Sequence, residues 1–263
     1  MKVYKSLFKK FLKGIIQKSN VLQKLYALFN QYFTWYPSQW TFDILNSYSL
    51  YNKNITFVQI GSNNGLHGDP LHKYIKLNNW KGVLVEPVSY LFNELKCNYK
   101  GFEANLSFEN SAVTYSCEDQ KFYRLTKSLQ PSLPYWYDQL GTFKKDVILK
   151  HQEFISCFNE LFTEETVNTI TFKQLLKKHE IKNLNLIHID TEGYDYEIIK
   201  SIPFDSLNVD LIMFEHKHLS HSEYKNGLKI LRKHGYTVKT MDQSDTIAVK
   251  RNIVNKIIHQ TTA

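Results

Sequence analysis

The feature that most constrains the fold is a short apolar run that ends in a glycine-rich loop near residue 60. The run contains Ile55, Phe57, Val58 and Ile60, and Gly61-Ser62-Asn63-Asn64-Gly65 follows it directly. A nearly continuous run of β-branched and aromatic residues is typical of a parallel strand that is buried on both faces. Glycine permits a sharp turn and the close approach of a ligand to the backbone. A strand, a glycine loop and then a helix form the first unit of nucleotide-binding α/β domains. We therefore predict a Rossmann-like α/β fold with a mostly parallel sheet.

A second predicted strand ends in an acid. Residues 81–87 form an apolar run that finishes in Glu86 and Pro87, and Glu86 lies 21 residues after Gly65 (86 − 65). A carboxylate at the tip of the second strand has two acceptor oxygens for the two hydroxyls of a ribose. Neither GxGxxG nor GxxxxGK[ST] is present, so a pyrophosphate ligand is not indicated. The loop instead suits an amino-acid tail, such as the methionine end of S-adenosylmethionine. The competing interpretation is a surface acid at the end of a strand.

The remaining strands follow in the order of an α/β domain. We predict strands at 106–113, 183–190 and 209–215, and then a closing hairpin at 236–241 and 246–249 whose last strand is antiparallel. Small and polar side chains at Asn110, Ser111 and Ala112 can face an adenine ring, although an ordinary strand end explains them equally well. The strand at 183–190 brings Asp190 to the carboxyl edge of the sheet, where ligands of such folds bind.

These motifs resemble the FkbM family of S-adenosylmethionine-dependent methyltransferases over roughly residues 55–250. The similarity lies in the glycine loop after residues 58–60, in Glu86-Pro87, in Ile189-Asp190-Thr191-Glu192-Gly193 and in Glu215-His216. The resemblance implies that S-adenosylmethionine is the cofactor. It also implies that the acceptor is a small molecule or glycan, with a hydroxyl of a glycan, glycolipid or natural product as the methylated group. The cofactor-binding residues that we predict are Gln59, Gly61, Ser62, Asn63, Gly65, Glu86, Pro87, Asn110, Ser111, Ala112 and Asp190. Many family members carry an acid where this chain has Gln59, so the cofactor's amino group is held more weakly or by another residue.

The predicted catalytic residues are His216, Asp190 and Glu192. A hydroxyl acceptor benefits from a base, and histidine titrates near neutral pH. We expect His216 to be that base and Asp190 with Glu192 to shape the junction of cofactor and acceptor. The alternative for His216 is a structural histidine whose hydrogen bonds are made locally at the end of a strand. The alternative for Asp190 is an acid that stabilises the N-terminus of a helix through the helix dipole. His216 and His218 could bind zinc together with Asp190. Lys217 brings a positive charge that repels a metal ion, and the ligand set is incomplete, so we predict no metal.

The N-terminal region differs in charge from the rest of the chain. Residues 1–20 contain six lysines and no acid, and their apolar residues recur at helical spacing. We divide the chain into a basic helical extension (1–50), a Rossmann-like methyltransferase domain (51–251) and a C-terminal tail (252–263). The first helix either caps the domain or lies on an anionic membrane surface, in which case the module need not be catalytic. RNA is a third alternative, but no RNA-binding signature accompanies the net charge of +8.

Two further expectations concern the middle of the chain and its compartment. Residues 128–154 are rich in aromatic residues and contain Pro131 and Pro134, which suits a substrate lid or, alternatively, an irregular packed loop. Thr171 is a predicted N-cap. Three cysteines without a CxxC spacing favour a reducing compartment, so we expect a cytoplasmic protein that contacts the inner face of the membrane if its first helix does.

Overall fold

The structure is a computed structural model that describes residues 39–116, 120–130, 132–134 and 136–258. Residues 1–38 lie outside this part, and with them the predicted membrane contact of residues 1–20. No helix within the described ranges is both long and apolar enough to cross a bilayer.

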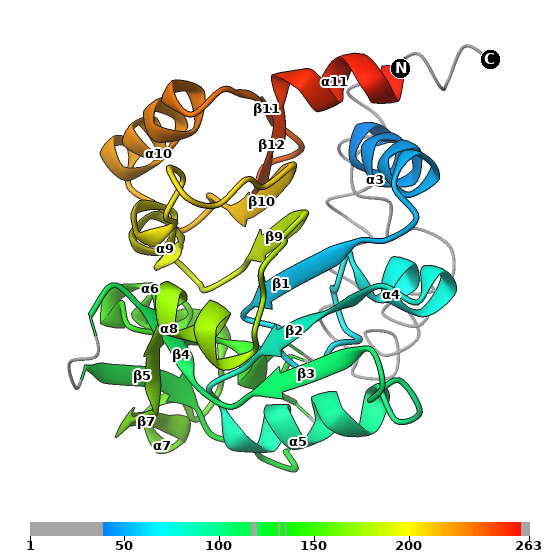
Figure 1. The fold of residues 1–263 in the computed structure, drawn as a ribbon. Helices are drawn as coiled ribbons and strands as arrows, with labels where there is room; N and C mark the ends of the chain where they lie inside the picture. Colours follow the sequence, from blue (N-terminus) through cyan, green and yellow to red (C-terminus); the bar gives the residue numbers. More distant parts are fainter. Residues whose placement is uncertain (1–38, 117–119, 131, 135, 259–263) are drawn as a thin grey trace, which may run out of the picture.

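A seven-stranded sheet forms the centre of the molecule (Figure 1). Its strands, in spatial order, are β11 (Tyr236–Thr240), β12 (Asp245–Lys250), β10 (Leu211–Glu215), β9 (Leu186–Ile189), β1 (Thr56–Ile60), β2 (Lys81–Val85) and β3 (Leu106–Glu109). All neighbouring pairs from β10 to β3 are parallel, whereas β12 is antiparallel to both β10 and β11. The predicted Rossmann-like arrangement with an antiparallel last strand is therefore confirmed.

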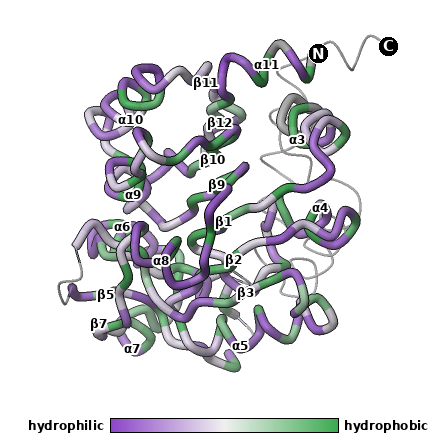
Figure 2. The backbone as a smooth tube through the Cα atoms, viewed as in Figure 1, coloured by the Kyte–Doolittle hydropathy of each residue, from purple (hydrophilic) through white to green (hydrophobic). Residues whose placement is uncertain are grey.

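Two helical layers cover the sheet because successive strand residues point to opposite faces. One face packs against α3 (Gln39–Tyr51), α4 (His72–Asn78), α5 (Ser89–Asn98) and α11 (Arg251–Ile258). The other packs against α8 (Phe172–Lys178), α9 (Asp195–Ser201) and α10 (His221–Lys233). Strand β1 shows this alternation. Phe57 packs on the face covered by α3, α4, α5 and α11, whereas Val58 and Ile60 pack on the face covered by α8, α9 and α10. Figure 2 shows hydrophobic and hydrophilic stretches side by side along α10, as expected for a helix with one buried face.

Two of the predicted boundaries differ from the structure. The run at 106–113 is not one strand, because β3 ends at Glu109 and β4 (Ala112–Thr114) leaves the main sheet to pair with β8 (Thr169–Thr171). Most of the predicted C-terminal tail instead forms α11, whose Ile253 and Ile257 are buried in the same cluster as residues of α3.

The segment between β4 and β8 is a small subdomain with its own apolar cluster. It contains β5 (Lys121–Leu125), β6 (Gly141–Thr142), β7 (Phe162–Thr166), α6 (Lys145–Leu149), α7 (Phe158–Leu161) and the short 3-10 helices η2 (Tyr137–Gln139) and η3 (Gln152–Phe154). Strand β5 pairs antiparallel with β6 and β7. The predicted lid is thus part of a larger folded unit. After it, Thr171 caps α8 in a reciprocal capping box with Gln174, which confirms the predicted N-cap.

Candidate active site

A cavity of about 430 Å³ lies at the carboxyl edge of the central sheet and is bounded on its other side by the subdomain. The strand register explains which residues meet there. Ile60 is aligned with Val85 and Ile189, and Ile189 with Phe214, so the next residue of each strand reaches the same edge. Those residues are Gly61, Glu86, Asp190 and Glu215, and all four line the cavity.

Gly61 is required where the loop after β1 passes the end of β9. Its φ is +77°, and a Cβ at this position would lie 1.7 Å from the carbonyl oxygen of Asp190. Ser62 then fastens the loop to β2, because its Oγ donates to the Gln59 carbonyl at 3.1 Å and accepts from the Val85 amide at 3.1 Å. The part of the cavity wall formed by residues 61–63 is therefore held between the Asp190 carbonyl on one side and the Ser62 hydrogen bonds to the backbone of β1 and β2 on the other.

Glu86 points into this wall, and its side chain is buried. One carboxylate oxygen accepts the Asn63 amide at 2.8 Å and the other accepts the Val88 amide at 2.9 Å. Burial raises the pKa of Glu86 to about 7, against the lowering effect of the two amides. Each oxygen of a carboxylate has a second acceptor site, so Glu86 can still bind a hydroxyl pair of a ligand.

An acidic side chain, Asp69, lies beside Gln59 in the lining of the cavity. The Gln59 side chain donates from Nε2 to Asp69 Oδ1 at 3.0 Å, and Asp69 lines the cavity beside it. Gln59 Oε1 and His188 Nδ1 are buried and have no hydrogen-bond partner among the described residues. Burial lowers the pKa of His188 to about 4, so its imidazole is neutral at pH 7. No sequence pattern predicts that Asp69 lies here, whereas His188 belongs to the strand predicted at 183–190 and is a less favoured candidate for the base.

The turn after β9 carries Asp190 and Glu192 into the cavity. Glu192 has a φ of +52°, which is rare for a residue other than glycine. The buried Asp195 holds this turn, since its Oδ2 accepts the Thr191 hydroxyl at 2.9 Å and the Gly193 amide at 3.3 Å, while its Oδ1 accepts the Glu215 amide at 3.2 Å. One carboxylate therefore fixes both the turn and the end of β10. Burial, with the neighbouring carboxylate of Glu192, raises the pKa of Asp190 well above its usual range.

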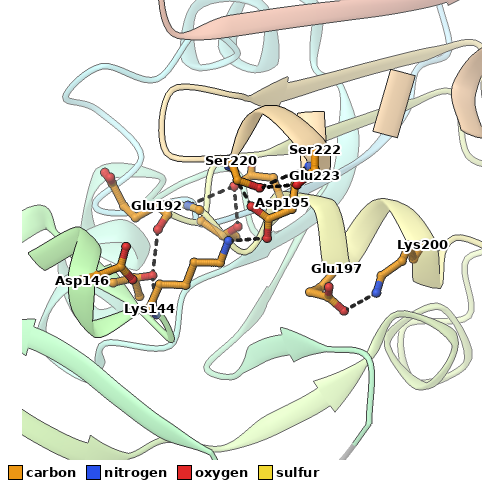
Figure 3. Close-up of polar contacts among 12 residues, drawn as sticks. Lys144, Asp146, Glu192, Asp195, Glu197, Lys200, Ser220, Ser222 and Glu223 are labelled. Carbon is orange, nitrogen blue, oxygen red and sulfur yellow. Dashed lines mark hydrogen bonds and ion pairs between the residues drawn. The ribbon is translucent and has the colours of Figure 1, made fainter. Parts of the chain in front are cut away.

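The subdomain is tied to the same turn (Figure 3). Thr142 of β6 donates its hydroxyl to the Glu192 carbonyl at 2.8 Å, and Lys144 forms an ion pair with Glu223 of α10 at 2.6 Å. The Lys144 side chain passes Gly193 on its way, because a Cβ at Gly193 would lie 3.4 Å from Lys144 Cδ. These contacts keep the insertion over the carboxyl edge of the sheet.

Three predicted site residues do not line the cavity. His216 stacks on Tyr224 with ring centroids 4.6 Å apart, and its Nδ1 lies 3.1 Å from the Thr246 hydroxyl. Asn110 uses its amide to bind the carbonyls of Glu86 and Pro87 at 2.8 and 3.0 Å. Gly65 serves packing, since a Cβ there would lie 2.4 Å from a side chain of α5. The other predicted residues line the cavity, namely Gln59, Gly61, Ser62, Asn63, Glu86, Pro87, Ser111, Ala112, Asp190 and Glu192.

The subdomain contributes aromatic groups from the predicted lid and an imidazole that sequence reasoning did not single out. Trp136, Phe143 and His151 line the cavity opposite the sheet. The His151 ring packs edge-on against Trp136 at 5.2 Å, and its Nε2 has no hydrogen-bond partner within the described residues. Burial lowers the pKa of His151, so it is a neutral base at pH 7. It lies within the predicted lid, but a lone histidine in an irregular segment has no sequence signal.

Comparison with known sequences decides the family. A sequence profile of the methyltransferase FkbM domain matches residues 59–238, which is more than half of the chain. The chain belongs to the FkbM methyltransferase family. A search of curated protein sequences gives no match.

Two solved methyltransferase structures are similar to this FkbM-family chain. One is an FkbM methyltransferase from Methylobacillus flagellatus, with 12% identity, a TM-score of 0.44, and coverage of 90% of this chain and 57% of that one. The other is precorrin-6y C5,15-methyltransferase from Geobacter metallireducens, with 11% identity, a TM-score of 0.39, and coverage of 79% and 88%. Similarity this weak carries no argument about substrates.

Proposed function

We propose that the chain transfers a methyl group from S-adenosylmethionine to a hydroxyl oxygen of a glycan, glycolipid or natural product. The observation that carries the proposal is the shared cavity, into which Gly61, Glu86 and Asp190 project from three aligned strands. Membership of the FkbM family supports methyl transfer, and the geometry supports a nucleoside with an amino-acid tail as the cofactor.

The residues present fit the cofactor at both of its polar ends. Glu86 has free acceptor sites for the two ribose hydroxyls. At the floor, Gln59 Oε1 is a buried acceptor without a partner among the described residues, and Asp69 is an acid beside it. An ammonium group would satisfy the amide oxygen and the carboxylate together, because buried polar atoms are rarely left unpaired. Asp69 would thus provide the charge that many family members place at the position of Gln59.

The acceptor side is formed by the subdomain and the turn after β9. Trp136 and Phe143 offer flat apolar faces of the kind on which a sugar ring stacks, and His151 lies among them. S-adenosylmethionine supplies a methyl group that is already activated by its sulfonium charge. Among the residues of this chain, His151 Nε2 would accept the proton of the acceptor hydroxyl as the methyl group is transferred. The remaining catalysis is alignment of the two reactants in the cavity and exclusion of water when they fill it.

Cofactor binding is tested by isothermal titration of the full chain with S-adenosylmethionine. At about pH 8, where Glu86 is mostly ionised, we expect Glu86→Ala to weaken binding by at least about tenfold, because each hydrogen bond to a charged acceptor contributes about 1.5–3 kcal/mol. Glu160→Ala, which removes an exposed carboxylate of the subdomain, is the matched control and should leave the affinity unchanged. The proposal fails if the wild type does not bind, or if Glu86→Ala binds as tightly as the control.

The acceptor is tested separately with S-adenosylmethionine that is isotopically labelled on its methyl group. We expect label to enter glycans or glycolipids as an ether that resists alkaline hydrolysis. Label in RNA, with a steep loss of binding as salt rises, would identify a nucleic-acid acceptor and refute the hydroxyl-glycan assignment.

A further inference from the structure

Three side chains converge on one point beside the cavity, to which the proposed methyl transfer assigns no role, and two of them, Glu192 and Glu215, also line the cavity. Glu192 comes from the turn after β9, Glu215 from the end of β10 and His218 from the segment that follows it. One ligand atom from each lies within 4.8 Å of the other two. His218 Nε2 is 3.0 Å from Glu192 Oε2 and 3.8 Å from Glu215 Oε1.

The converging atoms are buried and unsatisfied. Glu192 Oε2, Glu215 Oε2 and His218 Nε2 all lack a hydrogen-bond partner within the described part of the chain. The side chains of Glu215 and His218 are only 9% and 7% exposed. Burial of a charged or polar group without a partner is strongly unfavourable. His218 Nε2 and Glu192 Oε2 are within ion-pair distance of each other, and Glu215 Oε2 has no hydrogen-bond partner among the described residues, so one group that binds all three side chains would satisfy them together.

The charge of the surroundings indicates what that group is. Asp190 and Asp245 line the same cavity beside Glu192 and Glu215, and Lys217 is the lysine among the lining residues. Acidic side chains thus outnumber cationic ones around this point, and a divalent cation there would be compensated by their ionised forms. Two ligands on adjacent positions of a metal ion with bonds of about 2.1 Å are about 3 Å apart, which is close to the His218–Glu192 separation.

The ligand-bearing segments are also held in position before any ion binds. Asp195 accepts amides from Gly193 and from Glu215, so one buried carboxylate fixes the turn that carries Glu192 and the strand end that carries Glu215. Thr142 binds the backbone of Glu192 from the subdomain side. Such outer contacts orient ligands in metal sites generally.

We propose that Glu192, Glu215 and His218 form a binding site for a divalent metal ion, with open coordination positions directed into the cavity. Two carboxylates and one imidazole suit Mn²⁺ or Zn²⁺ better than an ion that prefers only oxygen. The sequence analysis predicted no metal and weighed a set of His216, His218 and Asp190. The structure turns His216 away from the cavity but brings His218 to Glu192 and Glu215. The ion's role rests on the proposed function: it would hold the acceptor oxygen and lower the pKa of its hydroxyl.

The test uses the full chain, freed of metal with EDTA and titrated with Mn²⁺ in the absence of cofactor. Loss of the free-ion electron paramagnetic resonance signal should report one Mn²⁺ per chain. Glu192→Gln, Glu215→Gln and His218→Gln should each weaken binding at least tenfold. Two matched controls are His216→Gln, which removes an imidazole, and Glu197→Gln, which removes a carboxylate. Both residues lie near the proposed site but outside it, so these replacements should leave the Mn²⁺ affinity unchanged. Glu197 lies on α9 and pairs with Lys200 (Figure 3).

A second readout separates a lost ligand from a variant that fails to fold. In the wild type, nitrogen hyperfine coupling to the bound Mn²⁺ should show one histidine ligand, which requires no variant. The proposal is overturned if Mn²⁺ does not bind, if the bound ion shows no nitrogen coupling, or if the three replacements bind it as tightly as the controls. If the chain binds Mn²⁺ but not S-adenosylmethionine, the proposed function is refuted and the metal site stands. If it binds S-adenosylmethionine but not Mn²⁺, the metal site is refuted and the proposed function stands.

Discussion

Glu86 gives the stability of the protein an unusual dependence on pH. Burial raises its pKa to about 7 from the ordinary 4.5. At pH values between these two, the folded protein retains a proton that the unfolded chain has already released. The contribution of Glu86 to stability is therefore complete below about pH 4.5 and is lost as the pH rises through about 7.

The size of the effect follows from the two pKa values. At about pH 5.5, retention of the proton stabilises the fold by about 2 kcal/mol, and at about pH 8 by almost nothing. Glu86→Gln removes this difference while it keeps the size of the side chain. Glutamine has one acceptor oxygen, so either the Asn63 or the Val88 amide loses its partner, at a cost of about 1–3 kcal/mol that does not depend on pH.

The assay is urea unfolding of both proteins, followed by tryptophan fluorescence in the presence of EDTA at these two pH values. We compare the free energy of unfolding of the wild type with that of Glu86→Gln at each pH. The wild-type value minus the variant value should be about 2 kcal/mol larger at about pH 5.5 than at about pH 8. Glu160→Gln controls for the loss of one carboxylate elsewhere. The reasoning is refuted if the difference between wild type and Glu86→Gln is the same at both pH values, or larger at the higher one.

Three shorter predictions concern other residues of the site and its surroundings. Gly65→Ala should lower the Tm several degrees more than Gly101→Ala, because both residues have a positive φ but only at Gly65 would the added Cβ collide with α5, at 2.4 Å; equal shifts in thermal unfolding would contradict this. Gln59→Glu should lower the Tm of the free protein by placing a second carboxylate beside Asp69, yet S-adenosylmethionine should raise the Tm by more than in the wild type; an equal or smaller rise would argue against an ammonium group at this point. His151→Gln should reduce kcat about 10²–10⁴-fold with little change in cofactor affinity measured by calorimetry, and an undiminished kcat would exclude it as the base.

The sheet and the half of the cavity that we assign to the cofactor were predictable because local patterns determine them. Buried parallel strands are continuous apolar runs, and their carboxyl ends meet at one edge, so the positions of Gly61, Glu86 and Asp190 followed from the sequence. The break between β3 and β4 falls at Asn110 and Ser111, residue types that are uncommon in strands, but the pairing of β4 with β8 was not predictable because it depends on tertiary contacts.

The chemistry on the acceptor side was harder to predict for a different reason. His216 directly follows β10, as a catalytic base would, but Thr246 and Tyr224 hold its ring away from the cavity. His151 and Asp69 come from irregular segments whose path has no periodic signal. His218 meets Glu192 only because of the turn that follows β10 and the one that follows β9. Pattern analysis therefore locates the edge of the sheet but not which of several polar residues near it face the ligand.

The pairing of β4 with β8 has a consequence for how new specificities can arise in this chain. The segment between these strands begins and returns at neighbouring places, since Ala112 is paired with Thr169 and its amide binds the Asn168 carbonyl at 2.7 Å. Insertions and replacements between the two strands need not disturb β1, β2 or β9. The half of the cavity that we assign to the acceptor can therefore change with this segment while β1, β2 and β9 stay intact.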